Sequence, residues 1–143
     1  MTANQEMTQE LGLPIDHLGI AVEDLETATI PYRFLGLSQV GAEEVIVSQS
    51  VRVRVLQAGP NLIELLEPTS PASPIAHFLR QRGPGLHHLA FRVNDLEGEL
   101  ARLSADGALL IDATPRPGRA GTRVAFLHPR WTKGVLVELV EHG

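Results

Sequence analysis

Ile15-Asp16-His17-Leu18-Gly19-Ile20-Ala21-Val22 is the stretch that decides the fold, because Leu86-His87-His88-Leu89-Ala90-Phe91-Arg92-Val93 repeats its pattern 71 positions later. Two further pairs of segments match: VRVRVL at 51–56 with TRVAFL at 122–127, and LIEL at 62–65 with LVEL at 136–139. Each copy carries one histidine near its start and one glutamate near its end, namely His17 and Glu64, then His88 and Glu138. If the copies pack about a pseudo-twofold axis, these four side chains converge. Two imidazoles and two carboxylates suit a divalent cation.

Composition limits the alternatives. The chain has 143 residues, of which 43% are hydrophobic, so it can form one compact domain whose two copies are half-domain modules. A net charge of −5 gives no support for a nucleic-acid surface, and the absence of cysteine excludes disulfides, thiolate metal sites and thiol nucleophiles. No apolar run is long enough to span a membrane, and residues 1–13 form a polar leader rather than a signal peptide. We therefore expect a soluble cytoplasmic protein.

Alternating side chains predict a strand at the start of each copy. His17, Gly19 and Ala21 share one face of the first strand, and His88 takes the equivalent place in the second. Helices follow, with Asp24 and Asn94 as expected N-caps, and Pro31 predicts a kink or a restart. Three more strands are predicted in each copy, at 36–43, 51–56 and 61–67, then at 108–113, 122–127 and 135–141.

These elements define an α+β fold of two tandem βαβββ modules. The single domain covers 14–143, with module one at 14–68, a connector helix at 73–82 and module two at 86–141. Two four-stranded sheets would then form a curved half-barrel with a metal-binding cleft. Glu64 shares a strand face with Leu62 and Leu66, where a carboxylate is costly to bury unless a cation pairs with it.

Neighbouring histidines and arginines are weaker candidates. His87 is predicted to lie on the strand face opposite His88, as a packed or hydrogen-bonded side chain rather than a ligand. Four basic residues fall in two loops, where they are solvated or contact a phosphate: Arg116, Arg119, Arg130 and Lys133.

The chain resembles the vicinal oxygen chelate superfamily (the glyoxalase/bleomycin resistance/dioxygenase group), and within it the methylmalonyl-CoA epimerases. The matching stretches are IDHLGIAV at 15–22, VRVRVLQAGPNLIELLEP at 51–68, SPIAHFLRQRGPGLHHLAFRV at 73–93, PRPGRAGTRVAFLHP at 115–129 and GVLVELVE at 134–141. Together they cover most of the chain after the leader.

The resemblance implies a metal held by His17, Glu64, His88 and Glu138, with Co, Mn, Ni, Zn and Mg as candidates. It implies an isomerase that removes and returns the C2 proton of methylmalonyl-CoA through a metal-stabilised enolate. Glu64 and Glu138, as pseudo-symmetry mates, are the candidate bases on opposite sides of the substrate. An acyl-CoA is thus the expected partner, and a homodimer is expected by resemblance.

Other functions use the same fold, and fold alone does not separate them. A glyoxalase I-like lactoylglutathione lyase would use the same four ligands and similar proton transfer. An extradiol dioxygenase is less favoured, because Fe(II) held by two histidines and one carboxylate would be crowded by the additional Glu64. A non-catalytic small-molecule-binding protein would have no need for two buried carboxylates.

Overall fold

The computed structural model describes residues 12–143 of the chain. Most of the predicted leader, residues 1–13, lies outside this range, although Leu13 packs against the core of module two. None of the helices between residues 12 and 143 has the length and hydropathy needed to cross a membrane.

Both modules contain the predicted helix and most of the predicted strands. Module one contains β1 (Ile15–Ala21), α2 (Leu25–Phe34), β2 (Ser38–Gln39), β3 (Glu44–Ile46), the 3-10 turn η1 (Val47–Gln49), β4 (Val51–Ala58) and β5 (Asn61–Pro68). The connector helix is α3 (Pro74–Arg82). Module two contains β6 (Gly85–Arg92), α4 (Leu96–Ala105), β7 (Arg116–Pro117), the 3-10 turn η2 (Arg119–Gly121), β8 (Arg123–Leu127) and β9 (Val137–Glu141).

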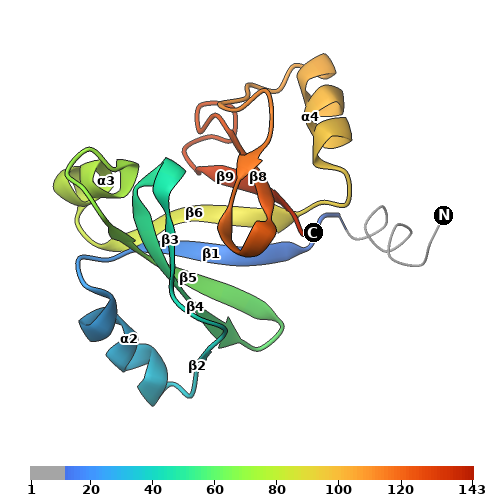
Figure 1. Ribbon diagram of the computed structural model, residues 1–143. Helices are drawn as coiled ribbons and strands as arrows, with labels where there is room; N and C mark the ends of the chain where they lie inside the picture. The colour runs from blue at the N-terminus through green and yellow to red at the C-terminus, as the bar shows by residue number, and fades with distance from the viewer. Residues whose placement is uncertain (1–11) are drawn as a thin grey trace.

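The two modules form one continuous curled sheet rather than two separate sheets. Its strand order is β2-β4-β5-β1-β6-β9-β8-β7, with β3 paired to β4 beside this path. The modules meet where β1 and β6 pair antiparallel in the middle of the molecule (Figure 1). Leu18 lies opposite Leu89, its own equivalent in the repeat. The pseudo-twofold axis therefore passes through this pair of residues.

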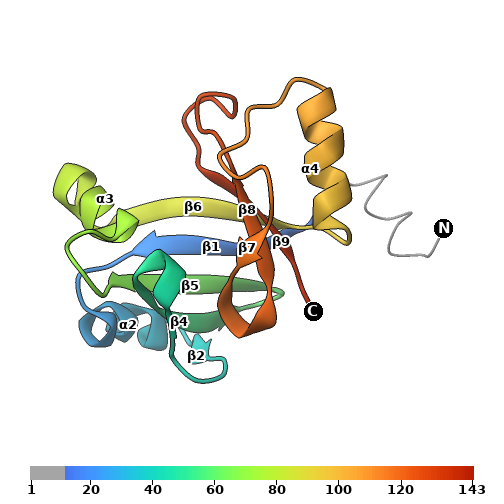
Figure 2. The same ribbon diagram turned by 45° about the horizontal axis from the view of Figure 1, so that its top comes forward.

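Side-chain alternation sends each strand's residues to two environments. On β5, Leu65 packs with Leu25 of α2, whereas Leu66 belongs to a cluster with Val53 on the other side of the sheet. In module two, Leu96 and Leu100 of α4 pack in a corresponding cluster. Figures 1 and 2 show α2 and α4 at opposite ends of the molecule. The predicted face of Glu64, shared with Leu62 and Leu66, is thus the face away from α2.

Two predicted strands are much shorter than expected. The segment 36–43 pairs only at β2, since Gly41 adopts a φ of 68° that ends the extended chain before β3. The segment 108–113 forms only one bridge, between Leu110 and Leu127. At Asp112 the side chain, and not a backbone carbonyl, accepts the hydrogen bond from Phe126 N, at 2.8 Å. The regular backbone pairing with β8 therefore does not continue there.

One of the two predicted helix N-caps is wrong. Asp24 caps α2 as predicted, and its side chain accepts from Thr27 N at 2.9 Å. Asn94 is not the second cap: Asp95, the residue equivalent to Asp24 in the repeat, accepts from Gly98 N at 3.1 Å. Pro31 does not divide α2, which stays one helix. Proline has no N–H to donate to the carbonyl four residues earlier, but that carbonyl belongs to the exposed first turn of the helix.

The cap of α4 gives a direct test. Asp95→Ala removes a hydrogen bond to an N-terminal amide of the helix, so we expect the free energy of unfolding to fall by about 1 kcal/mol. Urea denaturation followed by circular dichroism measures the change. Asn94→Ala is the matched control, expected to stay within about 0.5 kcal/mol of the wild type. Equal losses in the two variants would contradict the assignment of the cap.

Candidate metal centre

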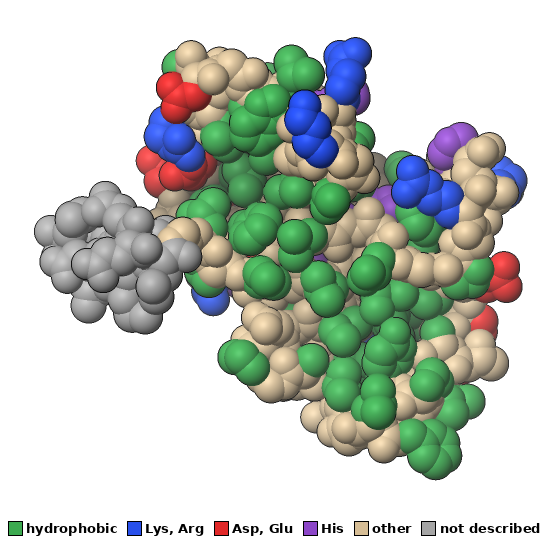
Figure 3. Space-filling model, turned by 180° about the vertical axis from the view of Figure 1, so that it is seen from behind, with side chains coloured by type: hydrophobic (Ala, Val, Ile, Leu, Met, Phe, Trp, Pro, Cys, Tyr) green, Lys and Arg blue, Asp and Glu red, His purple; other side chains and the backbone are tan. Residues whose placement is uncertain are grey.

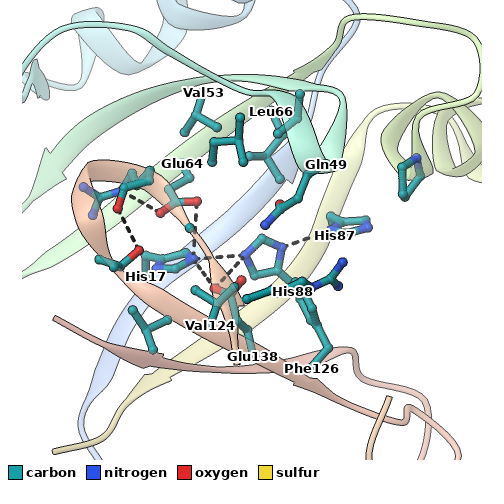
Figure 4. A pocket seen from close by; sticks show the side chains of 18 of the residues that line it. His17, Gln49, Val53, Glu64, Leu66, His87, His88, Val124, Phe126 and Glu138 are labelled. Atoms are coloured by element: carbon teal, nitrogen blue, oxygen red, sulfur yellow. Dashed lines mark hydrogen bonds and ion pairs between the residues drawn. The ribbon is translucent and has the colours of Figure 1, made fainter. Parts of the chain in front are cut away.

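Four neighbouring strands bring the four predicted residues together. His17 lies on β1, Glu64 on β5, His88 on β6 and Glu138 on β9, and all four side chains are buried. The Nε2 atoms of His17 and His88 are 3.0 Å apart. Oε1 of Glu138 lies 3.0 Å from His17 Nε2 and 3.6 Å from His88 Nε2 (Figure 4). This convergence is the arrangement that the repeat predicts.

The four residues are not equivalent. His17, His88 and Glu138 each offer one ligand atom, and these three atoms lie within 4.8 Å of one another. Glu64 reaches His17 Nε2 with Oε1 at 3.4 Å, while its Oε2 accepts a hydrogen bond from Arg119 Nε at 2.9 Å. The structure thus presents a three-residue candidate metal site, with Glu64 beside it.

Two β-bulges place the residues that orient the histidines. The pairing of β1 with β6 shifts by one residue between Ile15 and His17, and again between Gly19 and Ile20. The unpaired residues are Asp16 and His87, which are equivalent in the repeat. A bulge turns a side chain away from strict alternation. For this reason His87 lines the same cleft as His88, and the prediction that it lies on the opposite face is wrong.

Each bulged side chain contacts the Nδ1 atom of the next residue. His17 Nδ1 donates to Asp16 Oδ2 at 2.7 Å, and the Nδ1 atoms of His87 and His88 lie 3.0 Å apart. Burial, with the charge of Arg82, lowers the pKa of His87 to about 4, so His87 is neutral near pH 7 and can accept from His88 Nδ1. Because Nδ1 is occupied in both rings, Nε2 is the atom that each histidine presents to the cleft. His87 is a hydrogen-bonded histidine outside the ligand group, as predicted.

The electrostatics favour a positive charge at this point. Burial opposes protonation of His17, but its bond to Asp16 and the charges of Glu64 and Glu138 outweigh burial and raise its pKa to about 10. Burial disfavours the charged form of Asp16, yet hydrogen bonds from His17 and His142 lower its pKa to about 2. Burial lowers the pKa of His88 and raises that of Glu138.

The donor set fits a divalent cation. Oε1 of Glu138 is buried and has no hydrogen-bond partner among residues 12–143. It faces Nε2 of His17 and Nε2 of His88, and His17 would release its proton when a cation binds. Imidazole and carboxylate donors suit several divalent transition metals, and a cation between them would satisfy the buried oxygen and the two lone pairs together.

Sequence reasoning missed three contacts at this site. Arg119 pairs with Glu64 instead of being solvated, and His142 binds Asp16 Oδ1 through Nε2 at 2.6 Å. The third is the contact between His87 and His88. Only the last had a signal in the sequence, since the repeat aligns His87 with Asp16, next to a predicted ligand.

The centre lies in a cleft of about 230 Å³. Its walls are mostly apolar and include Val53, Leu66, Val124 and Phe126 (Figure 4). A second groove runs beside α3 and is lined partly by the same residues, His87, His88 and Leu136 among them. The cleft can therefore hold a small polar group at the centre while a longer molecule extends along the groove.

Comparisons with known proteins place this geometry in a family. Residues 16–126 match the model of the Glyoxalase/Bleomycin resistance protein/Dioxygenase superfamily. The chain belongs to this superfamily. It is 44% identical over 128 residues to the uncharacterized protein YqjC of Bacillus subtilis, covering 89% of this chain and 91% of that protein. It is 38% identical to the ethylmalonyl-CoA/methylmalonyl-CoA epimerase of Cereibacter sphaeroides, covering 87% and 95%.

A solved structure agrees with these relatives. The methylmalonyl-CoA epimerase from Mycobacterium tuberculosis superimposes with a TM-score of 0.86 at 42% identity, covering 90% of this chain and 87% of that chain. The glyoxalase-like fold and the resemblance to methylmalonyl-CoA epimerases, both predicted from the sequence, are thus confirmed.

In this superfamily member, the space for the His88 ring depends on Gly19. A Cβ atom at position 19 would lie 2.1 Å from His88 Cε1, so Gly19→Ala must displace the ring from the centre. We expect the affinity for Co²⁺, measured by calorimetry, to fall tenfold or more. Ala90→Gly is the control at the equivalent position and leaves the affinity within threefold. An unchanged affinity in Gly19→Ala would refute this role of Gly19.

A second prediction concerns His87. His87→Phe keeps an aromatic ring against Phe78, which it contacts edge-on at 5.1 Å, but removes the acceptor for His88 Nδ1. Loss of such a partner lowers metal affinity by about 10–100-fold, and we expect this for Co²⁺. His77→Phe, on the exposed side of α3, is the control. A variant that loses thermal stability but keeps its metal affinity would contradict an orienting role.

Proposed function

We propose that this protein is a metal-dependent epimerase that interconverts the C2 stereoisomers of methylmalonyl-CoA. The observation that carries the proposal is the convergence of two buried glutamates and two histidine Nε2 atoms in one cleft. The names of the relatives and of the similar solved structure support the same reaction and substrate.

We assign the metal to His17, Glu64, His88 and Glu138. Nε2 of each histidine and one oxygen of each glutamate would hold it, with Asp16 and His87 orienting the two rings. When bound, the cation supplies Lewis-acid stabilisation of the negative charge that develops on the thioester oxygen as the C2 proton leaves. Co, Mn, Ni, Zn and Mg all remain candidates, and the two imidazoles favour the transition metals over Mg.

Glu64 and Glu138 are also the proposed bases. They belong to β5 and β9, which flank the β1–β6 pair, so they approach the cleft from its two modules. Inversion at C2 needs one group to take the proton and another to return it on the other face. Burial raises the pKa of Glu138, which makes this carboxylate a stronger base than an exposed one. The mostly apolar walls of the cleft would limit the access of water to the reacting carbon.

The rest of the proposed substrate suits the second groove. This groove is mostly apolar and continues from His87 and His88 along α3, where His77 and Arg82 lie on its border. A thioester bound at the centre could lay its long pantetheine chain there and direct its phosphates toward these basic residues.

We also propose a homodimer in the cytoplasm. Figure 3 shows hydrophobic side chains gathered on the side of the molecule turned away from the view of Figure 1. A second copy of the chain could cover part of this surface, and light scattering of the purified protein measures its oligomeric state.

Deuterium exchange tests the epimerase proposal. The metal-loaded protein is incubated with stereochemically pure methylmalonyl-CoA in D2O, and mass spectrometry follows deuterium at C2 beside a chelator-treated sample. We expect metal-dependent uptake together with loss of stereochemical purity. Glu138→Gln should slow uptake by about a hundredfold or more, because it removes a base.

The control for this variant lies on the same strand. Glu141→Gln changes a carboxylate that pairs with Arg123 outside the cleft, and it should exchange like the wild type. Absence of exchange in a protein with bound metal would sink the proposed substrate and favour a thiol hemithioacetal isomerase or a binding protein. Full activity of Glu138→Gln would remove that residue from the mechanism.

A further inference from the structure

Arg119 is the one cation that contacts the four-residue centre among residues 12–143. Its Nε donates to Glu64 Oε2 at 2.9 Å, and both side chains are largely buried, with 15% and 9% of their surface exposed. Because a buried guanidinium is costly to desolvate, its position beside a metal centre calls for an explanation.

The turn that carries Arg119 is held firmly. Thr122 donates to the Arg119 carbonyl twice, from its backbone N at 2.9 Å and from Oγ1 at 2.7 Å. Ala120, at a φ of 50°, donates its N–H to Glu44 Oε1 of module one at 2.9 Å. The turn η2 of module two is therefore fastened to module one, and Arg119 is placed over the cleft.

Most N–H donors of the Arg119 guanidinium form no hydrogen bond within residues 12–143. Arginine offers five N–H donors in a planar fork, and within the described range only Nε of Arg119 forms a hydrogen bond. Arg119 lines the cleft, so its two terminal NH2 groups are available to a molecule bound there. Their geometry matches the two oxygens of a carboxylate.

A charge count shows why such a donor is needed. A divalent cation together with Glu64 and Glu138 is electrically neutral, and Asp16 adds a negative charge that His142 contacts. A substrate carboxylate would meet no net positive charge at this centre without Arg119. The equivalent residue in module one is Ser48, so the guanidinium beside Glu64 has no counterpart in the repeat. Arg116, the other arginine that lines the cleft, lies over the Phe126 ring and beside Asp112 instead.

We propose that Arg119 forms a subsite that binds the free carboxylate of a 2-carboxyacyl thioester beside the metal centre. This inference rests on the proposed function and adds to it the residue that selects a carboxylated acyl group. Arg119 keeps Glu64 in place through Nε and holds the substrate carboxylate through its terminal nitrogens. The substrate then has one orientation, with its carboxylate toward Glu64.

The test compares two ligands that differ by one carboxylate. Calorimetry measures the dissociation constants of malonyl-CoA and acetyl-CoA for the metal-loaded protein. We expect the wild type to prefer malonyl-CoA at least tenfold, and Arg119→Met to reduce this preference at least tenfold while binding acetyl-CoA normally. Arg123→Met, which removes an arginine outside the cleft, should keep the wild-type preference.

A rescue variant separates charge balance from folding. Adding Glu64→Gln to Arg119→Met removes one negative charge, so part of the preference for malonyl-CoA should return. Mn²⁺ affinity, followed by electron paramagnetic resonance, reports whether each variant keeps the centre. The proposal would be overturned if Arg119→Met kept a preference for malonyl-CoA within twofold of the wild-type preference. It would also be overturned if the variant lost affinity equally for malonyl-CoA and acetyl-CoA and lost its affinity for Mn²⁺ as well.

The proposed function can fail independently. A wild-type protein that prefers malonyl-CoA through Arg119, yet shows no C2 exchange with methylmalonyl-CoA in D2O, would retain the carboxylate subsite and lose the epimerase assignment. Conversely, the wild type could exchange C2 normally while Arg119→Met keeps the preference for malonyl-CoA over acetyl-CoA. That result would retain the epimerase assignment and refute the carboxylate subsite.

Discussion

The antiparallel pairing of β1 with β6 is the constraint on which the rest of the structure depends. Because Leu18 lies opposite Leu89, β1 pairs with the strand that repeats its sequence, β6. His17 and His88 therefore lie on the same side of the sheet, close to the pseudo-twofold axis. β5 and β9 pair parallel to these strands and place Glu64 beside Gly19 and Glu138 beside Ala90. A change of one residue in this register would send the ligands to the outer face.

That convergence is unfavourable without a cation. Two imidazoles and two carboxylates lose their hydration when they enter a mostly apolar cleft, and a buried charge without a partner costs several kcal/mol. The raised pKa of His17 shows how strongly these surroundings favour a positive charge. A divalent metal at this candidate site would balance the two carboxylates, and its binding would also stabilise the folded chain.

Much of this was predictable because it follows from a repeat and from regular alternation. Each repeated His and Glu lies inside a strand, so a shared axis was enough to predict that these four side chains converge. The bulges at Asp16 and His87 were not predictable, since a bulge depends on the register with a strand 71 residues away. Arg119 was missed for a similar reason: its contact with Glu64 comes from a turn that crosses between modules. Asp95 could have been predicted, because strict use of the repeat selects it over Asn94.

Several residues at equivalent positions of the two modules differ in chemistry, so the cleft is less symmetric than the fold that forms it. Asp16 gives His17 an anionic partner, whereas His87 gives His88 a neutral one. Gly19 leaves room for the His88 ring, while its equivalent Ala90 carries a buried methyl group opposite His17. Glu64 is held by Arg119, but Glu138 faces the cleft with an oxygen that has no hydrogen-bond partner in the described chain. A substrate with one carboxylate and one thioester has no twofold symmetry. A cleft with equal halves would bind it in two orientations, whereas under the proposed function these three differences would favour one orientation, in which both glutamates would flank the same carbon.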